Sequence, residues 1–312
     1  MTVSGNLTGT TIALTDASGN GSSTLTLDGT AAQTISAAIT ASATGLGNVT
    51  VANTAGTVTF SEKVGDSAGK AVETITLNTG TTTVFDKAVD STAIIATTTA
   101  NSTFTGAVTN TGDIATGVGS TTVFNSTVNA ATSTLNGSTT FKDVVTLTGV
   151  LTTGTDSTIT LGSKFKGDSA TAITVADSTG AGELNQAANT VTVNLSNEFT
   201  TGSFVFLQNG ATAMDSVDLA AFKVTDTAIV DYTAALSTST HAIEITANKR
   251  TTAGIATHLG MSTAQAAALG QISAAVSGDA TASTALDTVL VAGGSTAVNA
   301  AEQLNSDAGA AM

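Results

Sequence analysis

The sequence predicts an all-β protein, a parallel β-helix (β-solenoid) with a short Ala-rich helical segment at its C-terminal end. Three observations predict it. Thr and Val, which favour strands, are abundant, and Pro is absent. Charged residues make up 10% of the chain, against about 25% in ordinary globular domains. A Phe recurs at intervals of 25, 19, 20, 17 and 24 residues, which indicates a solenoid or array; the series is Phe60, Phe85, Phe104, Phe124, Phe141 and Phe165.

Each of the first five Phe residues is followed four positions later by Val: Val64, Val89, Val108, Val128 and Val145. In the unit "STTVFNSTVNAATSTLNG" (120–137), we expect Thr122, Phe124, Val128 and Leu135 to be buried, with turns at 125–126 and 136–137. Propeller blades need about 40–50 residues, so a unit of about 20 fits one coil of a β-helix better. Equivalent side chains of adjacent coils lie ~4.8 Å apart, so Phe and Val should form stacked interior ladders. A disordered linker is disfavoured by the 41% hydrophobic content.

The chain stays strand-like to about residue 250, with strands expected in 189–199, 202–210, 221–232 and 241–249. The last of these, "HAIEITANK", alternates Ile243, Ile245 and Ala247 with polar residues, as a strand with one buried face does. We therefore predict that residues 1–250 form the β-helix.

Residues 251–312 are predicted to form a helical linker or cap. Ser262 and Gln265 form a capping-box pattern ahead of a helix over 266–276, and Gly278 is placed to end that helix. Two more short helices are expected over 280–291 and 295–304. Their apolar faces are small, so we expect them to pack on the strand region or on a partner.

A resemblance rests on the Thr/Gly/Asn-rich strand array, on "HAIEITANKR" (241–250) and on the Ala-rich end "AAEQLNSDAGAAM", above all "AAEQL" at Ala300–Leu304. In these features the sequence resembles autotransporter (type V secreted) passengers of alphaproteobacteria, of the rickettsial outer-membrane protein B type of surface antigen. The resemblance implies a β-helix exported through a C-terminal β-barrel translocator of the full-length protein, with a helical linker before the barrel. It also implies an extracellular location at the cell surface of a Gram-negative bacterium. The start, "MTVSGNLTG", has no export pattern, so we expect a fragment or a processed passenger.

No residue is predicted to be catalytic or to bind a cofactor. Arg250, beside Lys249, is expected to be a solvated strand end, and His258 to pack or lie on the surface of a helix; His241 also lies beyond the repeats. The motifs of zinc, phosphate-loop, dinucleotide and Ser–His–Asp sites are absent. Calcium binding is an open alternative at three predicted turns, which contain Asp156, Asp168 and Asp177. The sequence does not show which residues would be the calcium ligands.

Charge and hydropathy narrow the partners. The net charge is −14, and Lys and Arg number nine in all, so nucleic acid is not an expected partner, since phosphate binding needs basic clusters. There is no run of 18 apolar residues, so no transmembrane helix is expected. Cys is absent, which suits export and equally suits other locations.

These observations predict a non-catalytic surface structural protein that self-associates into a layer or filament. The first 15 residues carry no Pro and no charged side chain, and Ile12 and Leu14 alternate with polar or small residues, so an exposed strand edge is expected there. The alternative is an adhesin that binds a host or surface molecule. A polysaccharide-active β-helix enzyme is less favoured, because Arg, His and aromatic residues are scarce.

Overall fold

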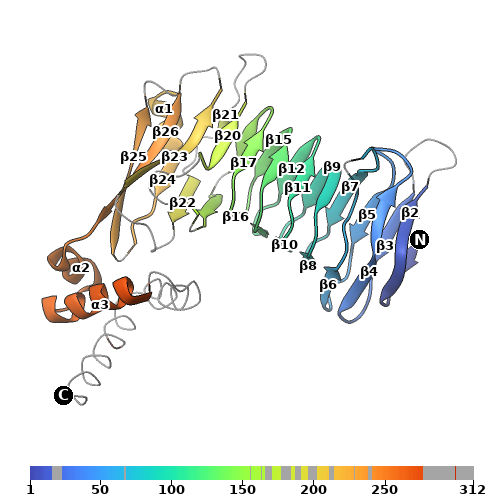
Figure 1. Cartoon of the computed structure of the whole chain (residues 1–312), viewed down its shortest axis with the longest axis horizontal. Helices are drawn as coiled ribbons and strands as arrows, with labels where there is room; N and C mark the ends of the chain where they lie inside the picture. Colours follow the sequence, from blue (N-terminus) through green and yellow to red (C-terminus); the bar gives the residue numbers. More distant parts are fainter. Residues whose placement is uncertain are drawn as a thin grey trace.

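The structure is a computed structural model that describes residues 1–15, 23–66, 68–154, 156–162, 164–165, 171–176, 184–186, 191–195, 202–210, 214–227, 229–237, 241–276 and 299. Over these residues the chain forms an all-β parallel β-helix with three helices. Figure 1 shows an elongated stack of short strands, with the N-terminus at one end and helices near the other.

The described strands belong to two sheets. One sheet forms a single face of the coil and contains β2 (Leu7–Leu14), β4 (Gln33–Ala41), β6 (Thr57–Phe60), β8 (Thr82–Phe85), β10 (Asn101–Phe104), β13 (Thr121–Phe124), β16 (Ser138–Phe141), β19 (Thr158–Leu161), β22 (Val191–Leu195) and β24 (Phe222–Val224). The other begins with β1 (Thr2–Val3), β3 (Thr24–Leu27), β5 (Asn48–Val51), β7 (Val72–Leu77) and β9 (Val89–Ala96).

The second sheet divides at β9, because this long strand serves two faces of the coil. Its first half pairs with β11 and its second half with β12. One branch continues through β11 (Val108–Asn110), β14 (Val128–Ala130), β17 (Val145–Leu147), β20 (Ile173–Val175) and β23 (Gly202–Asn209). The other contains β12 (Asp113–Thr116), β15 (Thr132–Leu135), β18 (Leu151–Thr153) and β21 (Leu184–Gln186). The coil therefore has three faces from β9 onward.

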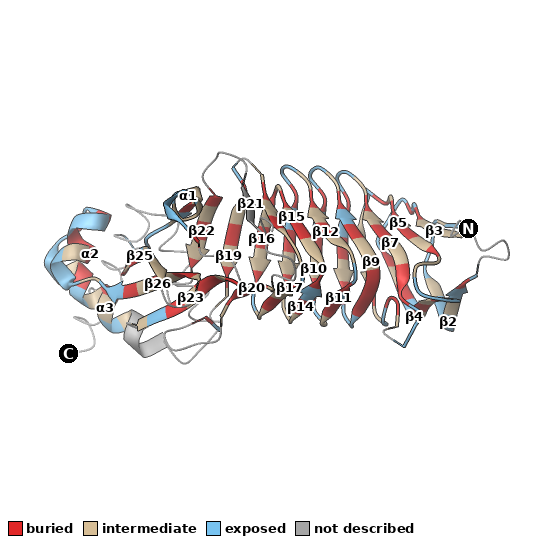
Figure 2. Cartoon of the chain, turned by 90° about the horizontal axis from the view of Figure 1, so that it is seen from above, coloured by how far each residue is buried: buried red, intermediate tan, exposed pale blue. Residues whose placement is uncertain are grey.

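The predicted Phe ladder is present. From Phe60 to Phe141 the five rings stack with centroids 4.7, 4.7, 4.9 and 5.4 Å apart and with interplanar angles of 3° to 14°. The strands that carry them pair in parallel, with Phe opposite Phe at each step. Residues alternate between buried and less buried along the strands (Figure 2), which follows from the two-residue period of a strand.

The Val ladder is also confirmed. Val64, Val89, Val108, Val128 and Val145 face one another in successive coils and are buried. Thr122 and Leu135 are buried as predicted. A ladder of short polar side chains lies two residues before the Phe ladder and consists of Thr83, Ser102, Thr122 and Thr139.

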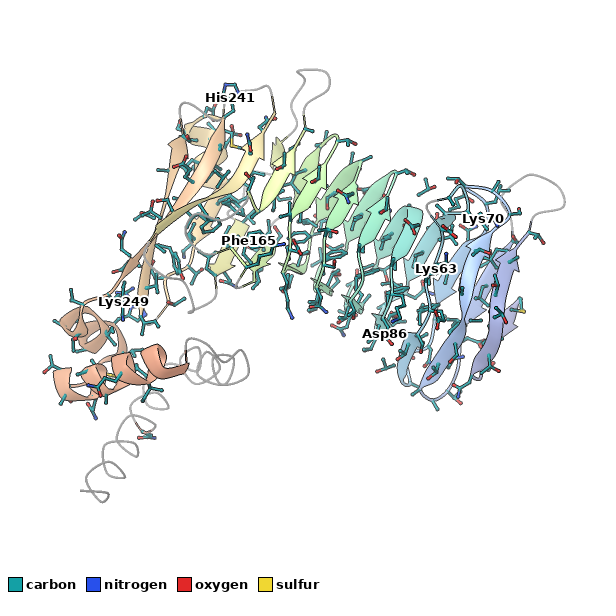
Figure 3. All side chains as sticks on the ribbon, viewed as in Figure 1. Lys63, Lys70, Asp86, Phe165, His241 and Lys249 are labelled. Atoms are coloured by element: carbon teal, nitrogen blue, oxygen red, sulfur yellow. The ribbon has the colours of Figure 1, made fainter. Side chains whose placement is uncertain are left out.

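The sixth Phe of the series leaves the ladder. Leu161 pairs with Phe141, because β19 stands 20 residues after β16 and the Phe lies four residues further on. Phe165 is nevertheless fully buried in the coil interior (Figure 3). The one-coil spacing, and not the identity of the aromatic residue, sets which side chain continues the column.

The strand prediction for 202–249 needs two corrections. Residues 221–232 are not one strand, since β24 ends at Val224 and β25 (Val230–Ser237) begins later. The final strands also do not form further parallel coils: β26 (Ala242–Lys249) pairs antiparallel with both β23 and β25. The strands predicted at 202–210 and 241–249 are present as β23 and β26. Of the stretch 189–199, residues 191–195 form β22 and the remainder lies outside the described residues.

Three helices are described: α1 (Ser216–Ala221), α2 (Thr252–Leu259) and α3 (Thr263–Val276). The Ser262–Gln265 capping box is confirmed, since the Ser262 backbone N–H donates to the Gln265 side chain at 2.7 Å and Ser262 Oγ accepts from the Gln265 N–H at 3.3 Å. Helix α1 was not predicted, although Asp215 and Asp218 form a capping box around its first turn. Gly278 and the helix expected over 280–291 lie outside the described residues, as does 295–304 apart from the helical Asn299.

The change from strand to helix near residue 250 falls where it was expected. Strand β26 ends at Lys249, and α2 begins at Thr252 after the Thr251 N-cap. Among the described elements, α1 alone is a helix placed ahead of this boundary. The role of 251–312 as a linker or cap stays a prediction.

Candidate self-association edge

The N-terminal coil presents a strand with one free edge. Strand β2 is the first strand of its sheet, and within the described part of the chain it pairs only with β4. Strand β1 likewise pairs only with β3 among the described strands. Unpaired backbone N–H and C=O groups on such an edge can pair with a strand of another chain.

The edge of β2 is partly protected, contrary to the sequence expectation. Its register against β4 shifts between Thr8 and Thr11, which marks a bulge. Bulges twist an edge strand and interrupt its pairing pattern. Regular pairing resumes at Thr11 and runs to Leu14, so these four residues form the regular part of the edge. Thr11 and Ala13 are exposed, whereas Leu14 is buried.

A buried amide pair holds this first coil onto the next two. Gln33 Nε2 donates to the carbonyl oxygens of Val3 and Gly5 at 2.9 and 3.0 Å. Its Oε1 accepts from the Gly29 N–H and from Asn53 Nδ2, both at 2.9 Å. The alternation Gln33, Ile35, Ala37, Ile39 places this Gln on the buried face, a signal that the sequence analysis did not use. The network fixes the N-terminal edge to the body of the coil.

The opposite end of the coil is covered differently. Helix α1 contacts β21, β24 and β25. Phe222 at the start of β24 packs its ring edge-on against Phe206, with centroids 5.3 Å apart. Figure 1 shows α2 and α3 beyond the lower end of the β25–β26 hairpin, where β26 leads into α2.

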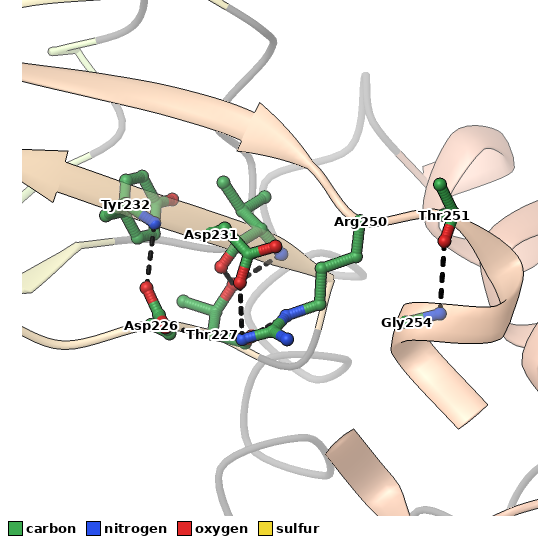
Figure 4. Close-up of polar contacts among 8 residues, drawn as sticks. Asp226, Thr227, Asp231, Tyr232, Arg250, Thr251 and Gly254 are labelled. Atoms are coloured by element: carbon green, nitrogen blue, oxygen red, sulfur yellow. Dashed lines mark hydrogen bonds and ion pairs between the residues drawn. The ribbon is translucent and has the colours of Figure 1, made fainter. Parts of the chain in front are cut away.

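Arg250 is not the solvated strand end that was predicted. Its side chain is 12% exposed, and its Nη2 lies 2.7 Å from Asp231 Oδ1 and 3.4 Å from Asp226 Oδ2. Its Nε donates to the Thr227 carbonyl at 3.2 Å (Figure 4). Asp226 also accepts from the Tyr232 N–H at 2.8 Å. The cluster ties the end of β26 to the start of β25, immediately before the Thr251 N-cap of α2.

The other singled-out residues are not brought together. His241 stands in the turn before β26 with a positive φ of 50°, while His258 is exposed in the last turn of α2. Asp156 is exposed in a turn with a φ of 58°. Asp168 and Asp177 lie outside the described residues. Within the described ranges no three His, Cys, Asp or Glu residues form a group that could hold a metal ion, and calcium binding stays a prediction.

Two carboxylates in loops have lowered pKa values. Lys63 Nζ, 2.6 Å from Asp66, and the Ala68 N–H hold the pKa of the Asp66 carboxyl below its ordinary value. Burial raises the pKa of Asp143, but hydrogen bonds from Lys164 and from the Val144 N–H outweigh it and leave the pKa lowered. Both groups are therefore ionised at neutral pH and are paired with Lys side chains.

No protein-family model matches the sequence, and neither the curated proteins nor the solved structures yielded a match. In the described part of the chain, no helix combines the length and the apolar character needed to cross a membrane.

Proposed function

We propose that this chain is a non-catalytic structural protein of a Gram-negative cell surface, an autotransporter passenger that self-associates through its N-terminal edge. The observation that carries the proposal is the free edge of β2, which is uncharged and regular over Thr11–Leu14. The resemblance around "AAEQL" supports the export route through a C-terminal β-barrel translocator.

The two ends of the coil differ, and this difference limits how copies assemble. At the C-terminal end β25 is also an edge strand, but helix α1 packs against it and against β24, whereas β2 pairs only with β4 among the described strands. Edge pairing of two N-terminal ends joins two copies symmetrically. A layer or filament therefore needs a second contact on a lateral face.

Sedimentation at rising protein concentration, with and without millimolar calcium, tests the proposal. We expect species larger than the 30.3 kDa monomer. Thr11→Lys with Ala13→Lys should abolish the contact, because charges on an edge strand oppose strand addition. A control with the same added charge, Thr109→Lys with Asn129→Lys, changes two exposed positions on another face and should leave the contact at the β2 edge intact.

Two outcomes would contradict the proposal. A strict monomer under all conditions would favour the adhesin alternative. Assembly that survives the two β2 charges would move the contact away from this edge.

A further inference from the structure

One face of the coil is an ordered array of small uncharged side chains. It is formed by the outward positions of seven successive strands, β6 to β22. Each strand contributes two residues, and the pairing register continues without a shift, so the residues form two straight columns. One column is Thr57, Thr82, Asn101, Thr121, Ser138, Thr158 and Thr192; the other is Thr59, Val84, Thr103, Val123, Thr140, Thr160 and Asn194. We call these residues the threonine face.

The threonine face repeats in two directions. Along the coil the repeat follows the rungs, whose stacked Phe rings are 4.7 to 5.4 Å apart. Along each strand the two outward residues are separated by about 6.6 Å, two strand residues. The stacked rings of β6 to β16 are close to parallel, with interplanar angles of 3° to 14°. The buried Phe ladder lies beneath β6 to β16, and Leu161 and Leu195 continue the column beneath β19 and β22, so a packed interior holds the spacing of the array.

The hydroxyl groups of this face remain available. Among the described residues, none of its Thr side chains is hydrogen-bonded to another side chain, and all of them are exposed or half-buried. Each hydroxyl can donate one hydrogen bond and accept two, and each Thr also presents a methyl group. Ordered water held between such groups costs little free energy when the groups are already fixed.

The absence of charged side chains from the threonine face favours an uncharged binding partner. The chain has a net charge of −14, but no charged residue stands in either column of the threonine face. The comparable outward columns of the β7–β15 face include the charged Asp113 and the large Ile95, whereas the largest apolar side chains of the threonine face are Val84 and Val123. A neutral, rigid, two-dimensionally periodic surface fits a partner that is itself periodic and rich in hydrogen-bond donors and acceptors.

We propose that the threonine face binds ice. In ice the oxygen atoms repeat at a spacing close to that of adjacent rungs, so hydroxyl groups in register can occupy lattice positions while the methyl groups order the water between them. This activity is independent of the proposed contact at the β2 edge, because β2 does not belong to the threonine face.

The test compares two variants that alter the same two coils. Asn101→Lys with Thr121→Lys places charges on exposed positions of the threonine face, in β10 and β13. Thr109→Lys with Asn129→Lys places the same charges on exposed positions of the next face, in β11 and β14. All four side chains point outward, and circular dichroism of each variant checks that the fold is retained.

The full chain and both variants are assayed for incorporation into a slowly growing ice front and for inhibition of ice recrystallisation. We expect the wild type to enter the ice and inhibit recrystallisation, the threonine-face variant to lose both activities, and the control to keep both. Exclusion of the folded wild type from ice, or equal loss in both variants, would overturn the proposal.

Two further measurements distinguish ice from other ligands that the threonine face could bind. Binding of the wild type to crystalline cellulose, lost in the threonine-face variant and without ice activity, would show a neutral polysaccharide instead of ice. Loss of self-association in that variant, again without ice activity, would show a second copy of the chain. The Thr11→Lys, Ala13→Lys variant should retain ice binding even if it does not assemble, so failure of one proposal is distinguishable from failure of the other.

Discussion

Replacing Phe124 by Ala tests the interior ladder most directly. The ring is 1% exposed and stacks between Phe104 and Phe141 at 4.9 and 5.4 Å. Strand β13 is hydrogen-bonded to a neighbour on each side, so the backbone cannot move inward to fill the space that the ring leaves. Truncation of a buried Phe costs about 3–5 kcal/mol, and loss of two stacking contacts places the expected free-energy change in the upper part of this range.

Urea denaturation followed by circular dichroism measures the loss as a fall in the midpoint. Solenoids can unfold coil by coil, so hydrogen exchange at the β13 amides provides a local readout beside the global transition. Val123→Ala is the matched control, because this residue belongs to the same strand and faces outward; it should cost less than about 1 kcal/mol. A loss below about 1 kcal/mol for Phe124→Ala, or one equal to the control, would refute the ladder as a source of stability.

A turn residue, the Arg250 ion pairs and the C-terminal helical segment can be tested in the same way. Thr99 has a φ of 58° at a turn where the adjacent coils have Gly80 and Gly119, so its backbone is in the left-handed region that favours Gly. Thr99→Gly should therefore raise the free energy of unfolding, measured by urea titration, by about 1 kcal/mol. A decrease would show that the left-handed backbone at Thr99 is not strained. Arg250→Leu should lower the free energy of unfolding by about 1 kcal/mol and speed amide hydrogen exchange at Val230 and Tyr232. The control Lys249→Leu changes an exposed residue and should have neither effect. Equal effects of the two substitutions would argue against a stabilising role of the Arg250 ion pairs. Deletion of 251–312 should leave the strand signal in circular dichroism largely intact, and its loss would make that segment part of the β core.

The sequence by itself determined the repeating part of the molecule. In a β-helix the spacing of equivalent residues along the chain is also the register between strands, so a Phe-to-Phe interval near 20 residues predicts which side chains stack. The same reasoning predicted the Val ladder and the inward direction of Thr122 and Leu135. The lack of charged side chains on the strand edge near Thr11 could be predicted as well, because this property depends only on the residue types within one strand.

Only the tertiary structure decided the features that depend on pairing partners. The bulge in β2 exists because of its register against β4, and the antiparallel hairpin at the other end places β25 beside β26 instead of adding a coil. Arg250 packs among Asp226, Asp231 and Thr227 because that hairpin brings together residues about 20 positions apart, and nothing in its local sequence shows this. A repeat predicts contacts through its period, whereas the ends have no period, so their contacts are determined by the folded arrangement.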